Sequence, residues 1–493
     1  MKKIAVLLSV LFLVAFTSCA TREGAIVDGA DIPRFPFPQH AFDRFAVAPM
    51  MPTVKTQAEM DGMVVDLFRE ILRNDLIVDS TGPQTRDGFR MVLRHFQAGE
   101  VAYGILDVSH ITTSESHGYG MVMLAYMAGS EGRLGFSQGE WLFGSANLRD
   151  YFDAMLRTVV AFPSNMGSSL FTLRLLGYQD IGLAGVTQGG YRMVDGVKTA
   201  PFTRDAVHGN STTGGNMDII YSLILADRQW GSAGSYDYIG IARAMLADLW
   251  AHCVHEQYRF LLLGDWVNAF GSPVHRSTAR TSDFMIGHLK AFRDADPVHD
   301  WQAVIDSALD AIRDIRRAQN LLGNTNGLLP DFVVRGAAGW EIPPGNIIES
   351  DDTAFAYNAI RAPWRLGTAY MLFGDIAMGD STLYDYVIRP LDDFARAFTG
   401  GGANLSRLGP LNMNGTPLFE WAHPNLFVPP FAVTAAAAGS DRQWVDAFWN
   451  YSPVNEWAFQ GLGSYHGDTY GDYIRLIVLL AITGNYWCPT WVR

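Results

Sequence analysis

Residues 112–129 read TTSESHGYGMVMLAYMAG, a polar run that leads directly into an apolar segment with the character of a helix. Glu115 then lies beside a helix N-terminus. Gly118 and Gly120 follow closely and leave room for another chain segment to approach the backbone. A carboxylate in this place serves either as a helix-capping group or as a reactive group in a cleft, and the local sequence leaves both roles open.

Helical periodicity dominates the chain on both sides of this run. Apolar residues recur at i, i+3, i+4 and i+7 in ten to twelve segments, among them 59–73, 146–162, 217–228, 238–255, 302–318, 356–374 and 469–483. Polar loops rich in glycine and proline separate them, the long ones at 128–145, 185–216, 321–355 and 400–430. No strand alternation of comparable strength is present. The pattern predicts an all-α fold of helical hairpins closed into one toroid, with the long loops gathered around a cleft. A helical solenoid is the alternative, although solenoids usually show a sequence repeat.

Composition excludes two broad classes of protein. The 493 residues include 37 Lys and Arg against 50 Asp and Glu, so the net charge is −13 and no basic stripe is available for nucleic acid. Apolar residues make up 48% of the chain and charged residues 18%, which excludes disorder for most of its length. The length allows either several domains or one large barrel.

The N-terminus has the pattern of an export signal. A basic start is followed by an apolar run from Ile4 to Phe16, which is too short to span a bilayer. The small residues before Cys19 resemble a bacterial lipoprotein signal, in which Cys19 becomes the lipidated N-terminus; simple secretion is the alternative. We therefore expect a signal peptide at 1–19, a Pro/Gly-rich tether at 20–50 and one folded domain at 51–493, on the cell envelope or secreted.

Two sequence patterns, one typical of serine hydrolases and one of metal sites, lack the surrounding sequence that such sites require. Residues 135–139 fit GxSxG, but a polar Gly-rich stretch precedes Ser137 where a nucleophile elbow requires a buried strand. His252, Cys253, His255 and Glu256 offer metal-ligand types without an assignable complete set. Phosphate-binding and dinucleotide-binding loops are absent from the sequence. We therefore predict no cofactor and no metal site, and leave open whether Cys253 and Cys488 pair.

A second polar region lies between 341 and 365. An acidic loop carries Glu341, Glu349, Asp351 and Asp352, and just beyond it Arg361 stands at the opening of a helix, where it could clamp a polyhydroxylated ligand. Two carboxyl groups on separate loops of one cleft are what glycoside hydrolysis needs. One is protonated and gives its proton to the leaving oxygen, and the other is ionised and activates water.

Five stretches, in order, resemble motifs of glycoside hydrolase family 8. They are 114–121 (SESHGYGM), 212–231 (TTGGNMDIIYSLILADRQWG), 280–285 (RTSDFM), 357–365 (YNAIRAPWR), and 468–470 with 483–487 (DTY and TGNYW). The resemblance spans about residues 55–490 and implies an (α/α)6 barrel that hydrolyses β-1,4-linked glycans with inversion. It assigns Glu115 as the general acid and implies substrate-binding roles for Tyr119, Asp283, Asn358 and Arg361.

The chain departs from the family pattern in the ATDGD block and at the base. Two aspartates of that block are Gly214 and Asn216 here, and the first of them holds the sugar at the cleavage site in the family. Asn358 stands where one branch has its catalytic base, so the chain follows the branch that takes its base from an acidic loop just upstream. Glu349 is the predicted base, with Asp351 and Asp352 as alternatives.

The leading hypothesis is a monomeric, inverting, endo-acting hydrolase of cellulose, mixed-linkage glucan, xylan or chitosan. Gly214 and Asn216 favour an alternative, a catalytically impaired glycan-binding lipoprotein of the same fold. Glu115, Asp283 and Arg361 favour the enzyme. Both hypotheses predict a polysaccharide or oligosaccharide partner, no nucleic acid, and membrane contact only through the lipid anchor. The sequence does not choose the glycan.

Overall fold

The computed structural model describes residues 32–95, 110–179, 183–187, 189–348, 351–419, 423–452 and 458–491. Pro33–Arg493 form one compact unit, and the following description is confined to it. None of the described helices combines the length and the apolar character needed to cross a membrane.

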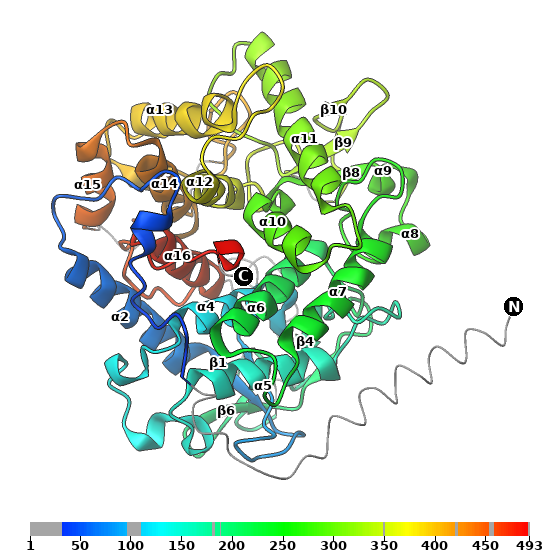
Figure 1. Ribbon diagram of the computed structural model, residues 1–493, viewed down its shortest axis with the longest axis vertical. Helices are drawn as coiled ribbons and strands as arrows, with labels where there is room; N and C mark the ends of the chain where they lie inside the picture. Colours follow the sequence, from blue (N-terminus) through cyan, green and yellow to red (C-terminus); the bar gives the residue numbers. More distant parts are fainter. Residues whose placement is uncertain are drawn as a thin grey trace, which may run out of the picture. The chain divides into compact units, whose positions relative to one another are not determined.

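Six helices form an inner ring (Figure 1). They are α4 (Ser114–Met127), α6 (Thr213–Trp230), α10 (Ile286–Ala295), α12 (Arg361–Phe373), α14 (Pro424–Ala438) and α16 (Thr469–Ile482). Each packs against the next in chain order, and α16 packs against α4, which closes the ring. Most residues of α4, α12, α14 and α16 are buried on all sides, which explains why these segments are apolar around the whole helix.

Six further helices form an outer layer around this ring (Figure 1). They are α2 (Gln57–Asp75), α5 (Leu148–Ala161), α7 (Tyr238–Cys253), α11 (Trp301–Leu321), α13 (Arg389–Phe398) and α15 (Arg442–Asn450). In that order they pack on α16, α4, α6, α10, α14 and again α14. The predicted all-α (α/α)6 barrel is therefore confirmed. Two four-residue helices, α8 (Val267–Phe270) and α9 (Pro273–Arg276), lie in the connection before α10.

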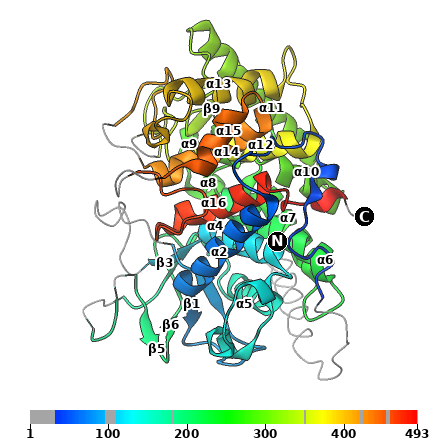
Figure 2. The same ribbon diagram turned by 90° about the vertical axis from the view of Figure 1, so that its left-hand side faces the viewer.

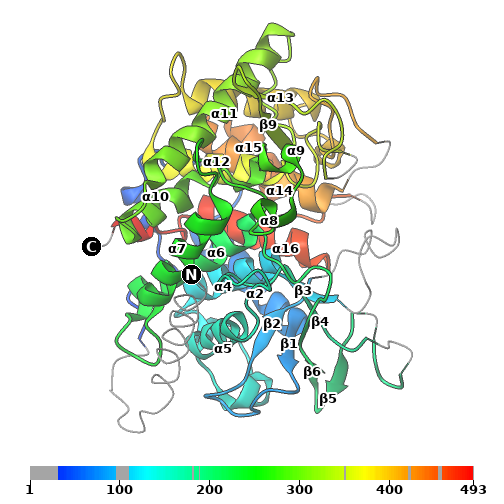
Figure 3. The same ribbon diagram turned by 90° about the vertical axis from the view of Figure 1, so that its right-hand side faces the viewer.

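Three small sheets lie in the long connections and were not predicted. Their orders are β2-β1-β6-β5, β10-β9-β8 and β3-β4-β7, and the strands of the first sheet gather beside α2, α4 and α5 (Figures 2 and 3). The strands are β1 (Leu76–Asp79), β2 (Met91–Leu93), β3 (His110–Thr113), β4 (Arg174–Leu176), β5 (Arg192–Val194), β6 (Val197–Ala200), β7 (Thr203–Arg204), β8 (Thr278–Arg280), β9 (Phe332–Arg335) and β10 (Trp340–Glu341). Strands of two to four residues are too short to give an alternation signal. Two of them position the site, because β3 runs directly into α4 and β8 runs into the turn η5 (Thr281–Asp283).

Residues 34–50, which we call the strap, cross the C-terminal ends of five inner helices. Backbone N–H groups of the strap donate to carbonyls at these ends, namely Gln229 of α6, Ala128 after α4, Gly484 after α16, Met371 of α12 and Ala436 of α14, at 2.8–3.0 Å. The last carbonyls of a helix lack partners within it, so the strap supplies hydrogen bonds that the barrel needs. The tether expected at 20–50 therefore does not extend past Ile32, and residues 20–31 of it lie outside the described residues.

Candidate active site

Glu115 lies in the first turn of α4 and is the one residue of that helix that is not buried. Thr113 is the N-cap, since its hydroxyl accepts a hydrogen bond from the backbone N–H of Ser116 at 3.3 Å. Glu115 is therefore not the capping residue. Its carboxylate instead accepts hydrogen bonds from the hydroxyls of Ser114 at 3.0 Å and Thr212 at 3.2 Å. Those two hydroxyls are 2.7 Å apart, so the starts of α4 and α6 jointly fix the carboxylate.

Glycines allow α4 and α6 to approach this closely. A Cβ on Gly118 would lie 2.8 Å from the carbonyl oxygen of Gly215, and a Cβ on Gly215 would lie 2.6 Å from the backbone nitrogen of Glu115. Side chains at either position would push the two helices apart. The predicted role of Gly118, room for another segment, is thus met by α6.

Asp283 occupies the room beside Gly214. A Cβ on Gly214 would lie 2.5 Å from Oδ1 of Asp283, so the carboxylate stands where a side chain of residue 214 would begin. The side chain is 1% exposed. Among the residues that the structure describes, Oδ2 accepts no hydrogen bond and forms an ion pair with Arg280 at 3.7 Å. Burial raises the pKa of Asp283, against the opposing charges of Arg280 and Arg361, and the Glu115 carboxylate adds to the rise. The gap expected at Gly214 is therefore filled by a second carboxylate near Glu115.

Asn216 has a structural role. Its Oδ1 accepts from the backbone N–H of Phe171 at 2.7 Å, and its Nδ2 donates to the carbonyls of Phe171 at 3.0 Å and Thr212 at 2.9 Å. The residue is fully buried. An aspartate cannot make the two donations when ionised, so an asparagine is what this backbone arrangement requires.

Arg361 lies at the start of α12 and is 3% exposed. One terminal nitrogen donates to Oδ1 of Asn358 at 2.8 Å, and the guanidinium lies 5.9 Å from the ring centre of Tyr470. Burial lowers the pKa of Arg361, but nearby groups that include Asp283 and Glu115 raise it well above its usual value. The structure thus places Glu115, Asp283 and Arg361 in the same region.

The rings of Tyr119 and Tyr470 pack against each other in a tilted arrangement near Arg361. Tyr119 is fully buried, with its ring 6.1 Å from that of Tyr470 and 5.9 Å from that of Trp364. Tyr119 thus packs beside Tyr470 in the fully buried layer next to Arg361. Its substrate-binding role stays a prediction.

Two of the three base candidates are described. Asp352 is fully buried, and its Oδ2 accepts hydrogen bonds from the backbone N–H groups of Ile347 and Ile348, the latter at 2.7 Å. This carboxylate therefore binds the backbone of its own loop. Asp351 is half-buried beside it. Glu349 lies outside the described residues, as does the lipidation candidate Cys19.

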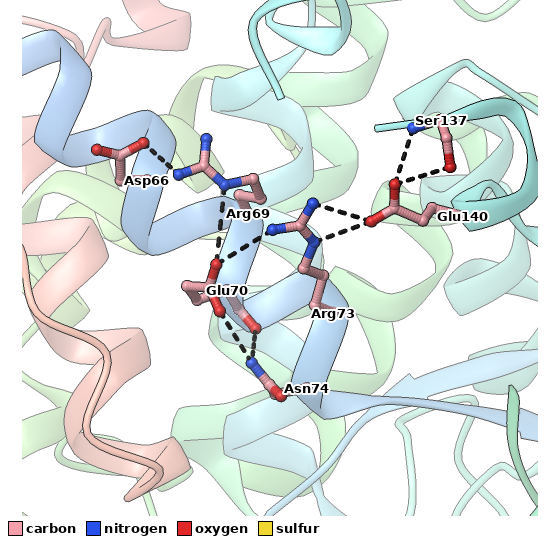
Figure 4. A network of polar contacts seen from close by, with 7 residues as sticks. All are labelled: Asp66, Arg69, Glu70, Arg73, Asn74, Ser137 and Glu140. Atoms are coloured by element: carbon pink, nitrogen blue, oxygen red, sulfur yellow. Dashed lines mark hydrogen bonds and ion pairs between the residues drawn. The ribbon is translucent and has the colours of Figure 1, made fainter. Parts of the chain in front are cut away.

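The GxSxG stretch forms a capping turn, as shown in Figure 4. Ser137 precedes the short helix η3 (Gln138–Glu140), and its hydroxyl donates to Glu140 at 2.9 Å. Glu140 in turn pairs with Arg73 of α2 at 2.9 Å. Ser137 therefore does not stand on a strand-to-helix elbow.

The histidine and cysteine group has no metal-binding geometry. Nδ1 of His255 accepts from the backbone N–H groups of Gln257 at 3.1 Å and Tyr258 at 3.2 Å. Within the described ranges, no three His, Cys, Asp or Glu side chains come together in a way that could hold a metal ion. Cys253 and Cys488 are both buried free thiols and do not pair.

Sequence reasoning missed three residues at this site. Thr212 belongs to the TTGGN block, in which the two replaced aspartates were the residues considered. Its hydroxyl donates to Glu115. Ser114 precedes Glu115 and donates a hydrogen bond to it. The sequence does not reveal this contact, because the Ser114 hydroxyl is also held by Thr212 at the start of α6. Asp331, whose carboxylate binds the turn before α12, stands in a loop with no motif around it.

The chain resembles known enzymes over most of its length, although no model of a protein family matches it. It is 27% identical to a β-glucanase of Niallia circulans over 92% of each chain, and 26% identical to an endoglucanase of Bacillus sp. strain KSM-330 over 80% of this chain and 72% of that one. The structure superposes on the apo β-1,3-1,4-glucanase of Paenibacillus sp. X4 with a TM-score of 0.70 and 27% identity, covering 92% and 100% of the two chains.

More distant structures share the fold. Rex8A of Paenibacillus barcinonensis, solved with xylose, gives a TM-score of 0.56 at 16% identity over 88% of this chain and 94% of that one. The closed ring of inner helices, the carboxylate at the start of α4 and the near-full-length relatives agree with one another. The similarity to a β-glucanase and an endoglucanase over most of the chain identifies it as a glycoside hydrolase that resembles family 8.

Proposed function

We propose that the protein is an inverting, endo-acting hydrolase of a β-1,4-linked glycan. The observation that carries the proposal is the placement of Glu115, the partly exposed residue of a buried helix, held by two hydroxyls and close to Asp283 and Arg361. In this role Glu115 donates its proton to the leaving oxygen. A carboxylate of the acidic loop removes a proton from the attacking water, and the two carboxyl groups stand about 6.5–9.5 Å apart to make room for that water.

Glu349 is the proposed base. Asp352 is the weaker alternative, because its Oδ2 already accepts two backbone hydrogen bonds and would have to give them up to bind water. Asp351 remains the second choice. This loop enters the α12 turn just before Asn358, which lies beside Arg361.

A glucan is the substrate that the relatives favour. Two relatives that each match 92% of this chain are named a β-glucanase and a β-1,3-1,4-glucanase. We therefore rank mixed-linkage glucan and cellulose above xylan and chitosan for this chain.

Asp283 is proposed to bind the sugar next to the scissile bond in place of the side chain that Gly214 lacks. A hydrogen bond from a sugar hydroxyl to a buried carboxylate strengthens as positive charge develops on the ring in the transition state. Gly214 was the main support for a catalytically impaired binding protein, and the neighbouring Asp283 carboxylate removes that support.

The N-terminal residues complete the proposal. We propose that Cys19 is lipidated, that residues 20–32 tether the barrel to the cell envelope, and that the protein acts as a monomer. Cys19→Ala should then release the protein from the membrane fraction or block its processing. Unchanged processing and membrane partitioning in that variant would remove the lipid anchor from the proposal.

Reducing-sugar release tests the activity. Lichenan and carboxymethylcellulose should yield the highest rates in a panel with xylan and chitosan, and proton NMR during the reaction should show the α-anomer first. Glu115→Gln should lower kcat by about a thousandfold or more, because an amide cannot donate the proton. Glu349→Gln should do the same with glycan binding retained.

Glu341→Gln is the matched control, since Glu341 is an exposed carboxylate upstream in the same connection. It should keep full activity. A wild-type protein that hydrolyses none of the four glycans would contradict the proposal.

A further inference from the structure

Asp331 is a buried carboxylate with a full set of hydrogen-bond donors around it. It lies at the start of β9 and is 1% exposed. Its Oδ1 accepts from the backbone N–H groups of Ala356 at 2.9 Å and Ala359 at 2.7 Å. Its Oδ2 accepts from the backbone N–H of Asn358 at 3.0 Å and from the Asn358 side-chain amide at 3.2 Å. These four hydrogen bonds offset the cost of burying the charge, and they tie the carboxylate to the turn that leads into α12.

The backbone of Asp331 joins two more segments of the site. Its N–H donates to the carbonyl of Ala354, at the end of the acidic loop, at 2.7 Å. Its carbonyl accepts from the N–H of Thr281 at 3.1 Å, and Thr281 opens the turn η5 that carries Asp283. One residue therefore connects the acidic loop, the Asp283 turn and the start of α12.

Asn358 carries this arrangement on to Arg361. Its Nδ2 donates to Asp331, so its Oδ1 faces the other way and accepts from Arg361 at 2.8 Å. The amide has one donor side and one acceptor side, and each is used. An ionised aspartate at 358 could not donate to Oδ2 of Asp331 and would place a second carboxylate against it.

We propose that Asp331 is a positioning residue for the glycosidase reaction. Without contacting glycan, it holds Arg361 in place through Asn358, and it fixes the end of the acidic loop relative to Asp283. The inference rests on the proposed function for its kinetic consequences. The placement of Arg361 can be tested independently of turnover.

Kinetics on lichenan supply the first test. Asp331→Asn places an NH₂ group opposite two donors, the N–H and the amide of Asn358, so Arg361 loses its anchor. We expect kcat to fall by about twentyfold or more while KM changes by less than about threefold. Asn358→Ala leaves the three backbone hydrogen bonds of Asp331 in place but cuts the link to Arg361. It should lower kcat by a similar factor with little loss in Tm.

The exchanged pair provides a rescue that a purely structural role would not give. In Asp331→Asn/Asn358→Asp, the new amide faces a carboxylate, which also still accepts from Arg361. We expect kcat at least about fivefold above that of Asp331→Asn alone. Asp296→Asn is the matched control, because Asp296 is a buried carboxylate (6% exposed) that caps Val298 and binds Trp301 near the start of α11. It should lower Tm and leave kcat within about twofold.

Crystal structures of the wild type and of Asn358→Ala separate this inference from the proposed function. The Arg361 guanidinium should move or lose its defined position in the variant, whether or not the wild type hydrolyses lichenan. An unmoved Arg361, wild-type kcat in both single variants, or an exchanged pair no better than Asp331→Asn would each overturn the inference. Absence of hydrolysis by the wild type with a displaced Arg361 would overturn the proposed function alone.

Discussion

Oδ1 of Asp283 lies 2.5 Å from the point where the Cβ of residue 214 would stand if that residue were not glycine. The two positions are on different elements, the N-terminal turn of α6 and the turn η5, about seventy residues apart in the chain. A side chain at residue 214 would force the Asp283 carboxylate to shift from its present position. The glycine in the TTGGN block and the aspartate of RTSDFM therefore belong to one arrangement.

Gly214→Ala tests this arrangement directly. The new Cβ would overlap Asp283, so the carboxylate must shift away from its place near Glu115, and kcat should fall by about tenfold or more. Gly62→Ala is the control, because Gly62 is an interior residue of α2 whose Cβ would meet nothing within 4 Å. That substitution should leave kcat unchanged and raise the free energy of unfolding by up to about 1 kcal/mol. Full activity in Gly214→Ala would show that the position of Asp283 is irrelevant.

Asn216→Asp restores the residue type of the family block and should nevertheless damage the protein. An ionised aspartate repels the carbonyls of Phe171 and Thr212, to which Asn216 donates. Two buried hydrogen bonds are lost, so the free energy of unfolding should fall by about 2–4 kcal/mol. Urea denaturation measures this change. A gain in activity together with unchanged stability would contradict the structural role given to Asn216.

Asp75 should make the protein less stable as the pH rises. Burial raises the pKa of Asp75 to about 7, against the opposing effects of Arg94 and Tyr465. The folded state therefore holds a proton that the unfolded chain releases near pH 4, so this contribution to stability falls between about pH 4 and pH 7. Asp75→Asn should reduce the decline in Tm between pH 5 and pH 8, whatever its effect on Tm itself.

Asp66→Asn is the comparison for that experiment, because Asp66 is on the same helix with its side chain 60% exposed. Its decline in Tm should match that of the wild type. An equal decline in Asp75→Asn would mean that Asp75 is ionised in the folded protein throughout this range.

Ser137→Ala should leave glycan hydrolysis unchanged. The hydroxyl of Ser137 binds Glu140 in an exposed capping turn (Figure 4), and its loss should cost less than about 1 kcal/mol of stability. Kinetics on lichenan would detect any other role. Loss of activity with an unchanged Tm would point to a function for this serine that its contacts do not suggest.

Much of the fold could be predicted because its helices are long and repeat their apolar pattern. The segments at 59–73, 302–318 and 469–483 coincide with α2, α11 and α16. The strands could not be predicted, since β8 and β3 have three and four residues and are defined by partners distant in sequence. The strap could not be predicted either, because a Pro/Gly-rich stretch has the same composition whether it is free or hydrogen-bonded to helix ends.

The candidate site was predictable where one motif carries one group, as with Glu115 and Arg361. It was not predictable where function depends on two distant residues together. The space that Gly214 leaves is occupied by the Asp283 carboxylate, and the side-chain amide of Asn358 donates to Asp331. Neither pair can be recognised from the sequence, because its two residues lie far apart in the chain with no fixed spacing between them. Asp352 shows the converse, since an acidic residue in the right loop turns out to bind its own backbone.

The strap also constrains the order in which the protein can be assembled. Residues 34–50 are synthesised before all the barrel helices, yet their partner carbonyls include Gly484 after α16, about 430 residues later in the chain. The hydrogen bond from Ala41 to Gly484 can therefore form only after α16 has been synthesised, so the strap cannot be fully docked before the chain is nearly complete. Contacts between such distant parts form slowly, because the chain entropy of closing the loop is lost before any contact compensates for it.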